Sequence, residues 1–463
     1  MDQADQELAS GRGAALTQRE HRALTPPGGL AAGPRSAPAV LRGWTELAEK
    51  LFSAYPGSLG LHLGDGPSGL FGRAAGRQAQ PDFSLGLRDA QVLRRLVVGR
   101  DPLRFADAYF RGDLEIEGDL FAALRLKDFL HELRLPARDR LKLLLRALRL
   151  GNEAADDSLA APDVKAHTRQ ENRAAIAFHY DVSNEFYALW LDPAMVYSCA
   201  YFERPELSLA EAQTAKLEHI CRKLRLREGE RFLDIGCGWG ALVMHAARHH
   251  GVRAHGVTLS SQQLALARQR IAAAGLGDSV TVELCDYRDL QGEGSYDKVA
   301  SVGMFEHVGL RNLPQYFAKV HSLLKPAGLF LNHGITHNEE GWGQALSAKF
   351  INRYVFPDGE LDLLSNVQRT MERQRFEILD VEGLRAHYAL TLRHWVAGLE
   401  RHHDEALQHV SESTYRIWRL YMAASALEFE TGELGIYQIL GSARGADAAA
   451  LQDRPWTRRY MYP

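Results

Sequence analysis

The sequence predicts an α/β protein in which a doubly wound parallel sheet follows a smaller N-terminal α+β domain. Two observations support this fold class. From about residue 166 onward, short apolar runs typical of buried strands alternate with helical patterns. One of these runs, residues 231–235, ends in a glycine-rich turn that opens a helix. The length of 463 residues is also too great for one typical domain.

The segments before residue 166 differ in composition. Residues 1–40 are rich in Ala, Gly, Pro and Arg and are predicted to form a disordered tail. Residues 41–150 combine helical spacing of apolar residues with short apolar runs and turns, which predicts a small α+β domain. Residues 151–165 are polar and small, as in an interdomain linker that precedes a domain over 166–463.

The end of the α+β domain carries a basic amphipathic pattern. Four leucines between residues 141 and 148 fall on one helical face, and four Arg or Lys residues between 138 and 149 form an adjacent stripe. This composition suits anionic lipid headgroups. A surface helix with a solvated charged face explains the same pattern, and the sequence alone favours that simpler interpretation.

In the larger domain, the apolar pattern predicts alternating strands and helices. Strands are expected at residues 231–235, 253–258, 280–285, 298–302 and 328–332, and helices at 241–250 and 260–274.

Charge and cysteine content exclude several classes of protein. The 55 Lys and Arg against 58 Asp and Glu give a net charge of −3, which argues against a nucleic-acid binder. The four cysteines form no C-x-x-C pair, so neither a zinc knuckle nor a disulfide framework is expected, and a reducing cytoplasm fits. No secretory signal or transmembrane segment is visible.

The glycine-rich turn has a particular chemistry. Its spacing is G-x-G-x-G, Asp234 precedes the first glycine, and Asp286 follows the third strand. The second strand ends in Thr258-Leu259-Ser260, without the acidic residue that a nicotinamide ribose requires. These features favour S-adenosylmethionine, a cationic sulfonium amino acid, over a dinucleotide. Glycines used only for a tight turn are the simpler alternative.

Several longer motifs resemble one enzyme family. LDIGCGWG, GVTLSSQQ, CDYRDL, SVGMFEHVG and NRYVFP occur in this order, after HYDVSNEFYALWLDPAMVYSCAYF. Together they resemble the cyclopropane-fatty-acyl-phospholipid synthase family, which includes the mycolic-acid methyltransferases. The resemblance covers roughly residues 41–440 and implies a Rossmann-like methyltransferase domain.

The resemblance also implies two sets of site residues and no metal. S-adenosylmethionine would be bound by the glycine turn, by an upstream segment that closes over it, and by residues at the ribose and adenine: Leu233, Asp234, Ile235, Gly236, Cys237, Gly238, Trp239, Gly240 and Ala241; Tyr197 and Ser198; Thr258, Leu259 and Gln263; Asp286, Tyr287 and Arg288. Bicarbonate would be held by Cys199, Glu306, His333, Ile335 and Tyr388, with Cys199 and Ile335 contributing mainly backbone N–H groups.

The implied reaction adds a methylene group to the cis double bond of an unsaturated acyl chain in membrane phospholipid. Methyl attack leaves a carbocation, and bicarbonate removes a proton as the cyclopropane ring closes. Aromatic faces can stabilise that cation, and Tyr388, Tyr354, Phe350 and Phe356 are candidates, with packing in the core as the alternative for each.

Other outcomes stay open. The same first step could give a methyl- or methylene-branched chain, and a non-catalytic lipid-binding protein could keep this fold. We expect a cytoplasmic enzyme that associates peripherally with the inner face of the membrane. Members of the family are often dimers, which leaves a homodimer open.

Overall fold

The computed structural model describes residues 48–49, 51–64, 68–75, 80–88, 92, 103–132, 138, 182–339, 346–355, 360–445 and 454–462. The expectations for the tail at 1–40 and the linker at 151–165 lie outside these residues. So does the basic pattern at 138–150, apart from Arg138.

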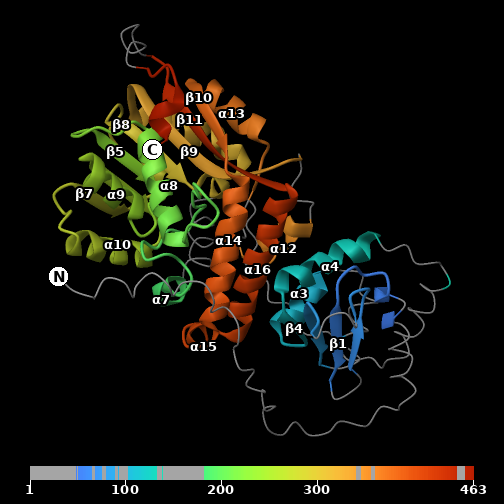
Figure 1. The fold of residues 1–463 in the computed structure, drawn as a ribbon. Coiled ribbons are helices and arrows are strands. Elements are labelled where there is room, and N and C mark those ends of the chain that lie inside the picture. Colours follow the sequence, from blue (N-terminus) through green and yellow to red (C-terminus); the bar gives the residue numbers. More distant parts are fainter. Residues whose placement is uncertain are drawn as a thin grey trace, which may run out of the picture.

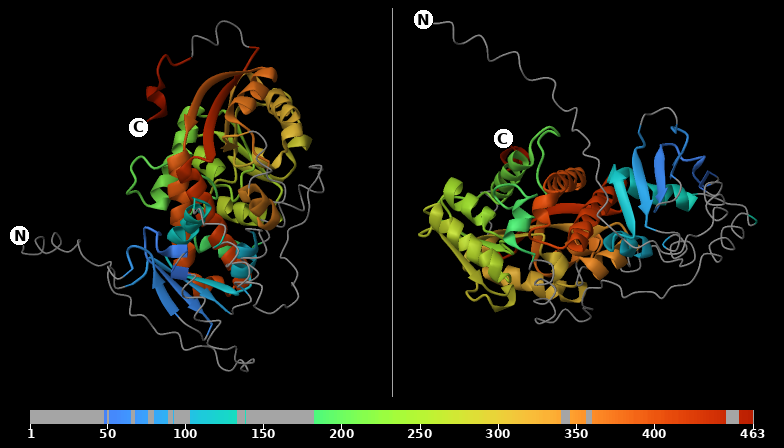
Figure 2. Two further views of the ribbon diagram at one scale, coloured as in Figure 1. Left: turned by 90° about the vertical axis from the view of Figure 1, so that its right-hand side faces the viewer. Right: turned by 90° about the horizontal axis from the view of Figure 1, so that it is seen from below.

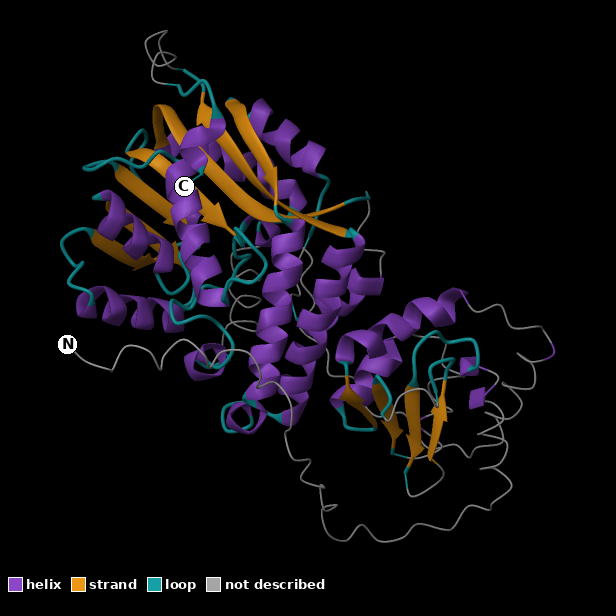
Figure 3. Ribbon diagram, viewed as in Figure 1, coloured by secondary structure: helices purple, strands orange, loops and turns teal. Residues whose placement is uncertain are grey.

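The larger domain is built on a seven-stranded sheet in the order β10-β11-β9-β8-β5-β6-β7 (Figures 1 and 3). β9, β8, β5, β6 and β7 are parallel, while β11 runs antiparallel between β9 and β10. The bounds are β5 (Arg231–Ile235), β6 (Arg253–Thr258), β7 (Val280–Leu284), β8 (Tyr296–Val302), β9 (Leu324–His337), β10 (Phe376–Gly383) and β11 (Leu434–Ala443).

Helices cover both faces of this sheet, so the doubly wound prediction is confirmed. One hydrophobic cluster joins the sheet to α8 (Leu209–Lys223), α9 (Ala241–His250) and α10 (Ser261–Ala273). A second cluster joins the opposite face to α11 (Leu313–Leu323) and α13 (Leu364–Arg373). The predicted strands and helices of this domain are all present, whereas β10 and β11 were not predicted.

Local sequence signals set the ends of these helices. α8 begins with a capping box in which Ser208 and Glu211 each bind the other's backbone N–H. α9 ends at Gly251 in the left-handed conformation, which glycine adopts without steric cost.

Two long helices extend from this domain toward the N-terminal module. α14 (Arg385–Arg401) and α16 (Glu412–Thr431) pack against each other, with α12 (Leu346–Tyr354) beside them (Figure 1). The short α7 (Asn184–Ala188) and α15 (His403–Ala406) complete this region. No helix among the described residues is long and apolar enough to span a bilayer.

Among the described residues, the N-terminal module includes a four-stranded sheet and the helices α3 and α4. The sheet has the order β2-β1-β3-β4, and only β1 and β3 run parallel. Its elements are β1 (Leu59–Leu63), β2 (Ser68–Phe71), β3 (Phe83–Leu87), α3 (Leu103–Phe110), β4 (Leu114–Gly118) and α4 (Leu120–Glu132).

The module joins the larger domain through α3, α4 and β4, which contact α12 and α16 (Figure 2). The Tyr354 hydroxyl donates to Asp107 Oδ1 at 2.6 Å, and the Phe110 ring lies 5.1 Å from the Tyr354 ring. Arg416 of α16 binds Glu115 of β4 at 2.8 Å. One hydrophobic cluster runs through both parts, so the junction is a packed core.

Candidate active site

A first cavity lies beyond the carboxyl ends of β5, β6 and β7, the position where open α/β sheets bind ligands. The turn at its floor needs glycine because Gly236 and Gly238 adopt φ values of +86° and +53°. Most of the predicted cofactor residues line it: Tyr197, Ser198, Asp234, Ile235, Gly236, Cys237, Gly238, Trp239, Ala241, Thr258, Leu259, Gln263, Asp286, Tyr287 and Arg288.

Two residues of the predicted set do not line this cavity. Leu233 is fully buried on the sheet face that packs against α11. Gly240 caps the N-terminus of α9, where a Cβ atom would meet Ala267 of α10 at 3.4 Å.

One end of the first cavity carries two buried groups of opposite charge. Asp234 Oδ1 has no hydrogen-bond partner among the described residues, and burial raises the pKa of this carboxyl to about 7 against the attraction of Lys216. Lys216 Nζ donates to Ser198 Oγ at 2.8 Å, and burial lowers its pKa to about 8. Near neutral pH this end can therefore attract both an ammonium and a carboxylate.

The other end of the cavity presents polar and aromatic groups. The Thr258 hydroxyl donates to Gln263 Oε1 at 2.8 Å, which fixes the amide at the end of β6. Arg288 binds Asp286 in a bidentate ion pair, in which Nε donates to Oδ1 at 2.9 Å and Nη2 donates to Oδ2 at 2.6 Å. Tyr287 lies beside this pair, and burial raises its pKa to about 12.

A second cavity adjoins the first, because residues such as Tyr197, Ser198 and Gly303 line both. All five predicted bicarbonate ligands line this second cavity: Cys199, Glu306, His333, Ile335 and Tyr388. The rest of its wall is largely apolar and includes Ile351, Leu361, Leu392, Tyr421, Phe429, Leu434 and Ile436.

Glu306 and His333 bring polar atoms into this apolar surrounding. Glu306, in a short 3-10 turn after β8, accepts the Ile335 N–H on Oε1 at 2.7 Å. Its Oε2 has no partner among the described residues, and burial raises the pKa of the carboxyl. His333 lies on β9 beside Gln438 of β11, whose Nε2 is 3.4 Å from His333 Nδ1.

Burial lowers the pKa of His333 well below its usual value, so the ring is neutral. With Gln438 Nε2 donating to Nδ1, the single ring proton of His333 lies on Nε2. That atom is buried and has no partner among the described residues. His333 therefore offers one hydrogen-bond donor to this cavity.

Ile335 and Cys199 were both expected to contribute mainly backbone N–H groups, and the structure shows the Ile335 N–H and the Cys199 thiol in different contacts. The Ile335 N–H is bound by Glu306, so it holds the carboxylate in place. The Cys199 thiol is fully buried, donates to Ala200 O at 3.3 Å, and has its pKa raised by burial. This thiol is therefore protonated and does not serve as a nucleophile.

The aromatic candidates divide into two groups. Tyr388 lines the second cavity, but Phe350 and Tyr354 do not. These two rings lie on the face of α12 that packs against Phe110 of the N-terminal module, while Ile351 of the same helix faces the cavity. Of the two interpretations of Phe350 and Tyr354, the structure supports packing in the core. Phe356 lies outside the described residues.

Sequence reasoning missed several residues at the two cavities. Lys216 lies on the buried face of α8, and a lysine within an apolar helical stripe was the available signal. Gln438, Tyr421 and Phe429 come from β11 and α16, far along the chain from the motifs. No local pattern marks these three residues.

Known proteins resemble both the sequence and the fold. The family model described as mycolic acid cyclopropane synthetase matches residues 167–439. A probable fatty acid methyltransferase of Pseudomonas putida is 45% identical over 357 residues, covering 77% of this chain and 85% of that protein. The cyclopropane-fatty-acyl-phospholipid synthase of Escherichia coli is 38% identical over 274 residues, covering 58% and 67%.

A solved structure supports the same relationship. The mycolic acid cyclopropane synthase CmaA1, complexed with SAH and CTAB, superposes with a TM-score of 0.56 at 35% identity, covering 58% of this chain and 98% of that one. Its fold matches the α/β domain described above. The chain therefore belongs to the mycolic acid cyclopropane synthetase family and is an S-adenosylmethionine-dependent methyltransferase.

Proposed function

We propose that the protein transfers a methylene group from S-adenosylmethionine to the cis double bond of an unsaturated acyl chain in membrane phospholipid, which forms a cyclopropane fatty acid. The observation that carries this proposal is the second cavity. It is largely apolar, adjoins the cofactor cavity, and contains two buried polar atoms without partners among the described residues, Glu306 Oε2 and His333 Nε2.

The first cavity suits the methyl donor at both ends. The amino-acid part of S-adenosylmethionine carries an ammonium and a carboxylate, which Asp234 and Lys216 would bind. Thr258, Leu259 and Gln263 would contact the ribose, and Asp286 to Arg288 the adenine. When bound, the sulfonium supplies a methyl group electrophilic enough for an isolated alkene.

The second cavity suits an acyl chain. Its apolar wall excludes water, which would otherwise capture a carbocation on the chain. Four aromatic residues line it: Tyr197, Tyr388, Tyr421 and Phe429. Their faces stabilise positive charge without acting as nucleophiles. Tyr197 and Ser198 border both cavities and so would position the double bond near the methyl group.

The polar atoms of the second cavity also fit a bicarbonate ion. His333 Nε2–H can donate, and the raised pKa of Glu306 favours a protonated carboxyl that can donate as well. Ile335 fixes Glu306 by its N–H, and Gln438 fixes the ring of His333. When bound there, bicarbonate would supply the base for the final proton removal. His333 and Glu306 would orient the ion by donating hydrogen bonds to its oxygen atoms.

A second outcome of the same first step has its own support. Two relatives that cover most of this chain, from Pseudomonas putida and Mycobacterium tuberculosis, are described as probable fatty acid methyltransferases, and the second is 37% identical over 398 residues. A methyl- or methylene-branched acyl chain is therefore the alternative product. The shape of the second cavity would decide whether the carbocation closes to a cyclopropane ring or gives a branched chain.

We propose further that the enzyme acts at the inner face of the cytoplasmic membrane, with residues 41–150 as the lipid-docking domain. The support is the position of α12, which contributes Ile351 to the acyl cavity and packs its other face on α3 of the N-terminal module. A chain drawn from a bilayer would reach the cavity beside this contact. A homodimer is part of the same proposal by analogy with the family.

The function is tested by incubating the protein with vesicles of unsaturated phospholipid and methyl-labelled S-adenosylmethionine. Mass spectrometry of the released fatty acids should show label incorporated as one CH₂ per modified chain, with the double bond lost. Vesicles of saturated phospholipid serve as the control. Incorporation that does not depend on the double bond would contradict the proposal.

A further inference from the structure

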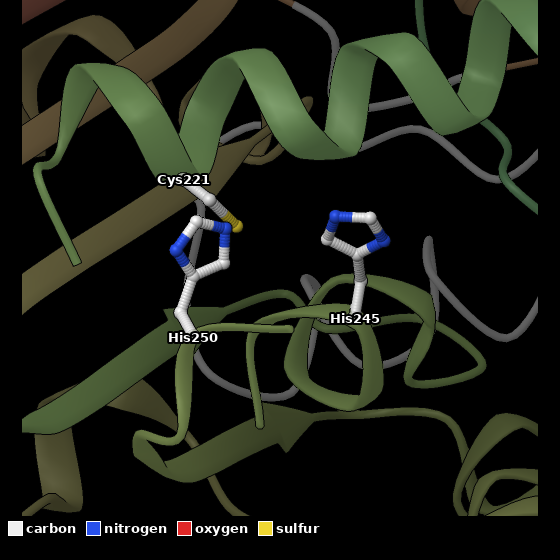
Figure 4. A group of neighbouring side chains, drawn as sticks. All are labelled: Cys221, His245 and His250. Atoms are coloured by element: carbon white, nitrogen blue, oxygen red, sulfur yellow. The ribbon is translucent and has the colours of Figure 1, made fainter. Parts of the chain in front are cut away.

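Outside the two cavities, a cluster of side chains within the described part of the chain has the composition of a metal site. It lies where the C-terminal half of α8 meets the end of α9, and it contains Cys221, His245 and His250 (Figure 4). The Sγ atom and one nitrogen of each ring all lie within 4.8 Å of one another. Figure 4 shows the thiol and both rings directed toward the same space between the helices.

The carboxylate of Glu218 lies against both rings of this cluster. Glu218, one turn before Cys221 on α8, has its Oε2 atom 3.2 Å from His245 Nε2 and 3.1 Å from His250 Nε2. Its other oxygen accepts from Arg222 Nε at 2.7 Å, which orients the group and leaves Oε2 directed at both rings. An outer partner that fixes a carboxylate in this way is typical of metal ligands.

The geometry suits a tetrahedral ion. Metal–nitrogen and metal–oxygen bonds of about 2.0–2.1 Å place two such ligands about 3.3 Å apart, close to the separations of Glu218 Oε2 from the two rings. A metal–sulfur bond of about 2.3 Å places sulfur about 3.5 Å from each nitrogen. The Cys221 sulfur lies within 4.8 Å of one nitrogen of each ring, so metal binding would draw the sulfur and the rings together.

We propose that Cys221, His245, His250 and Glu218 form a structural Zn²⁺ site. One thiolate, two imidazoles and one carboxylate are the borderline donor set that zinc prefers over Mg²⁺ or Ca²⁺. The burial that raises the pKa of Cys221 keeps its thiol protonated without metal, so binding releases that proton to solvent. Each neutral ring then carries its single proton on Nδ1 while Nε2 binds the ion.

The position explains what such an ion would do. Cys221 is fully buried, while the side chains of His245 and His250 are 11% and 18% exposed, so an ion can enter from the histidine side. The site would tie α9 to α8, which also carries Lys216 at the cofactor cavity. Since none of the four residues lines either cavity, the proposed function does not depend on this one.

Zinc and cobalt titrations of the full-length protein test the proposal. After treatment with a chelator and dialysis, the protein should bind one Zn²⁺ per chain in competition with a chromogenic chelator. Co²⁺ in its place should give the near-ultraviolet thiolate-to-cobalt charge-transfer band. Cys221→Ser should abolish the band and weaken Zn²⁺ binding by more than about 100-fold, since even outer-shell partners are worth about 10–100-fold.

His249→Gln is the matched control, because His249 is exposed on the same helix with its ring 4.5 Å from that of His245. The His249→Gln variant should keep both the Zn²⁺ affinity and the thiolate-to-cobalt band of the unmodified protein. His250→Gln is the second ligand variant, and S-adenosylmethionine binding checks that each variant is folded. The proposal is overturned if no Zn²⁺ binds, if no thiolate band forms, or if binding survives both ligand substitutions.

Discussion

Replacing Glu306 with Gln separates proton handling from packing in the second cavity. Oε1 accepts the Ile335 N–H at 2.7 Å, and the amide oxygen of Gln can keep that bond in a side chain of the same volume. The Oε2 atom, which has no partner within the described residues, becomes an amide nitrogen that cannot exchange a proton during the reaction. We therefore expect a folded protein that binds the cofactor but is impaired in its chemistry.

The expected loss of rate in Glu306→Gln follows from the lost proton-transfer group, whereas stability and cofactor affinity should be kept. A positioned proton-transfer group contributes about 10²–10⁴ in rate, which corresponds to about 2.7–5.4 kcal/mol of barrier. Exchanging one hydrogen-bond acceptor for another changes the free energy of unfolding by about 1 kcal/mol at most. Glu306 does not line the first cavity, so the affinity for S-adenosylmethionine should not change.

The assay combines three measurements on the variant and on a matched control. These are the rate of label transfer to unsaturated phospholipid, the affinity for S-adenosylmethionine by calorimetry, and the midpoint of urea unfolding. Glu360→Gln is the control, because the half-buried Glu360 side chain accepts the Leu310 N–H at 2.7 Å and lines neither cavity, while its backbone contact with Glu306 is kept. A rate for Glu306→Gln equal to that of Glu360→Gln would refute the assignment of Glu306.

Three further predictions concern the cofactor, the domain junction and the membrane. Because burial raises the pKa of Asp234 to about 7 and lowers that of Lys216 to about 8, cofactor affinity should rise as the pH passes 7 and fall above 8. In calorimetry, the affinity of Asp234→Asn for S-adenosylmethionine should no longer rise as the pH passes 7. An unchanged pH profile would contradict the role of Asp234 in binding the ammonium. Tyr354→Phe removes a buried bond to Asp107 and should cost about 1.5–3 kcal/mol of stability in urea unfolding, where an unchanged midpoint would contradict the contact. If residues 138–150 bind anionic lipid, activity on anionic but not neutral vesicles should fall at high ionic strength, and equal activity would exclude that role.

Part of the larger domain could be predicted because strands such as β5 and β6 are short and mostly buried. The bounds of β5, α9 and β6 follow from apolar runs punctuated by glycine, and the structure places them at the predicted residues. β10 and β11 were missed because half-buried residues interrupt the apolar pattern of β10, and no local signal shows that β11 enters the sheet antiparallel. Strand order is a long-range property that periodicity does not contain.

The site shows the same division between local and long-range information. Motif residues that follow consecutive strands converge at one edge of a parallel sheet, which is why the cofactor set could be assembled from sequence. Which face of α12 meets the cavity depends on where the N-terminal module packs, so the sequence left both interpretations of Phe350 and Tyr354 open. The group of Cys221, His245 and His250 spans two helices and contains no spaced motif, so the sequence predicted no metal site.

The product formed from a methyl donor labelled as CD₃ tests the central claim most directly. The protein is incubated with unsaturated phospholipid, and the released fatty acid is examined by mass spectrometry and proton NMR. Cyclopropane formation predicts that one deuterium is lost, that a CD₂ unit is retained, and that the remaining ring protons resonate at the high field typical of cyclopropanes, with no olefinic signal. A product that retains all three deuterium atoms, or that carries an exocyclic methylene carbon, would contradict ring closure and establish the branched-chain alternative.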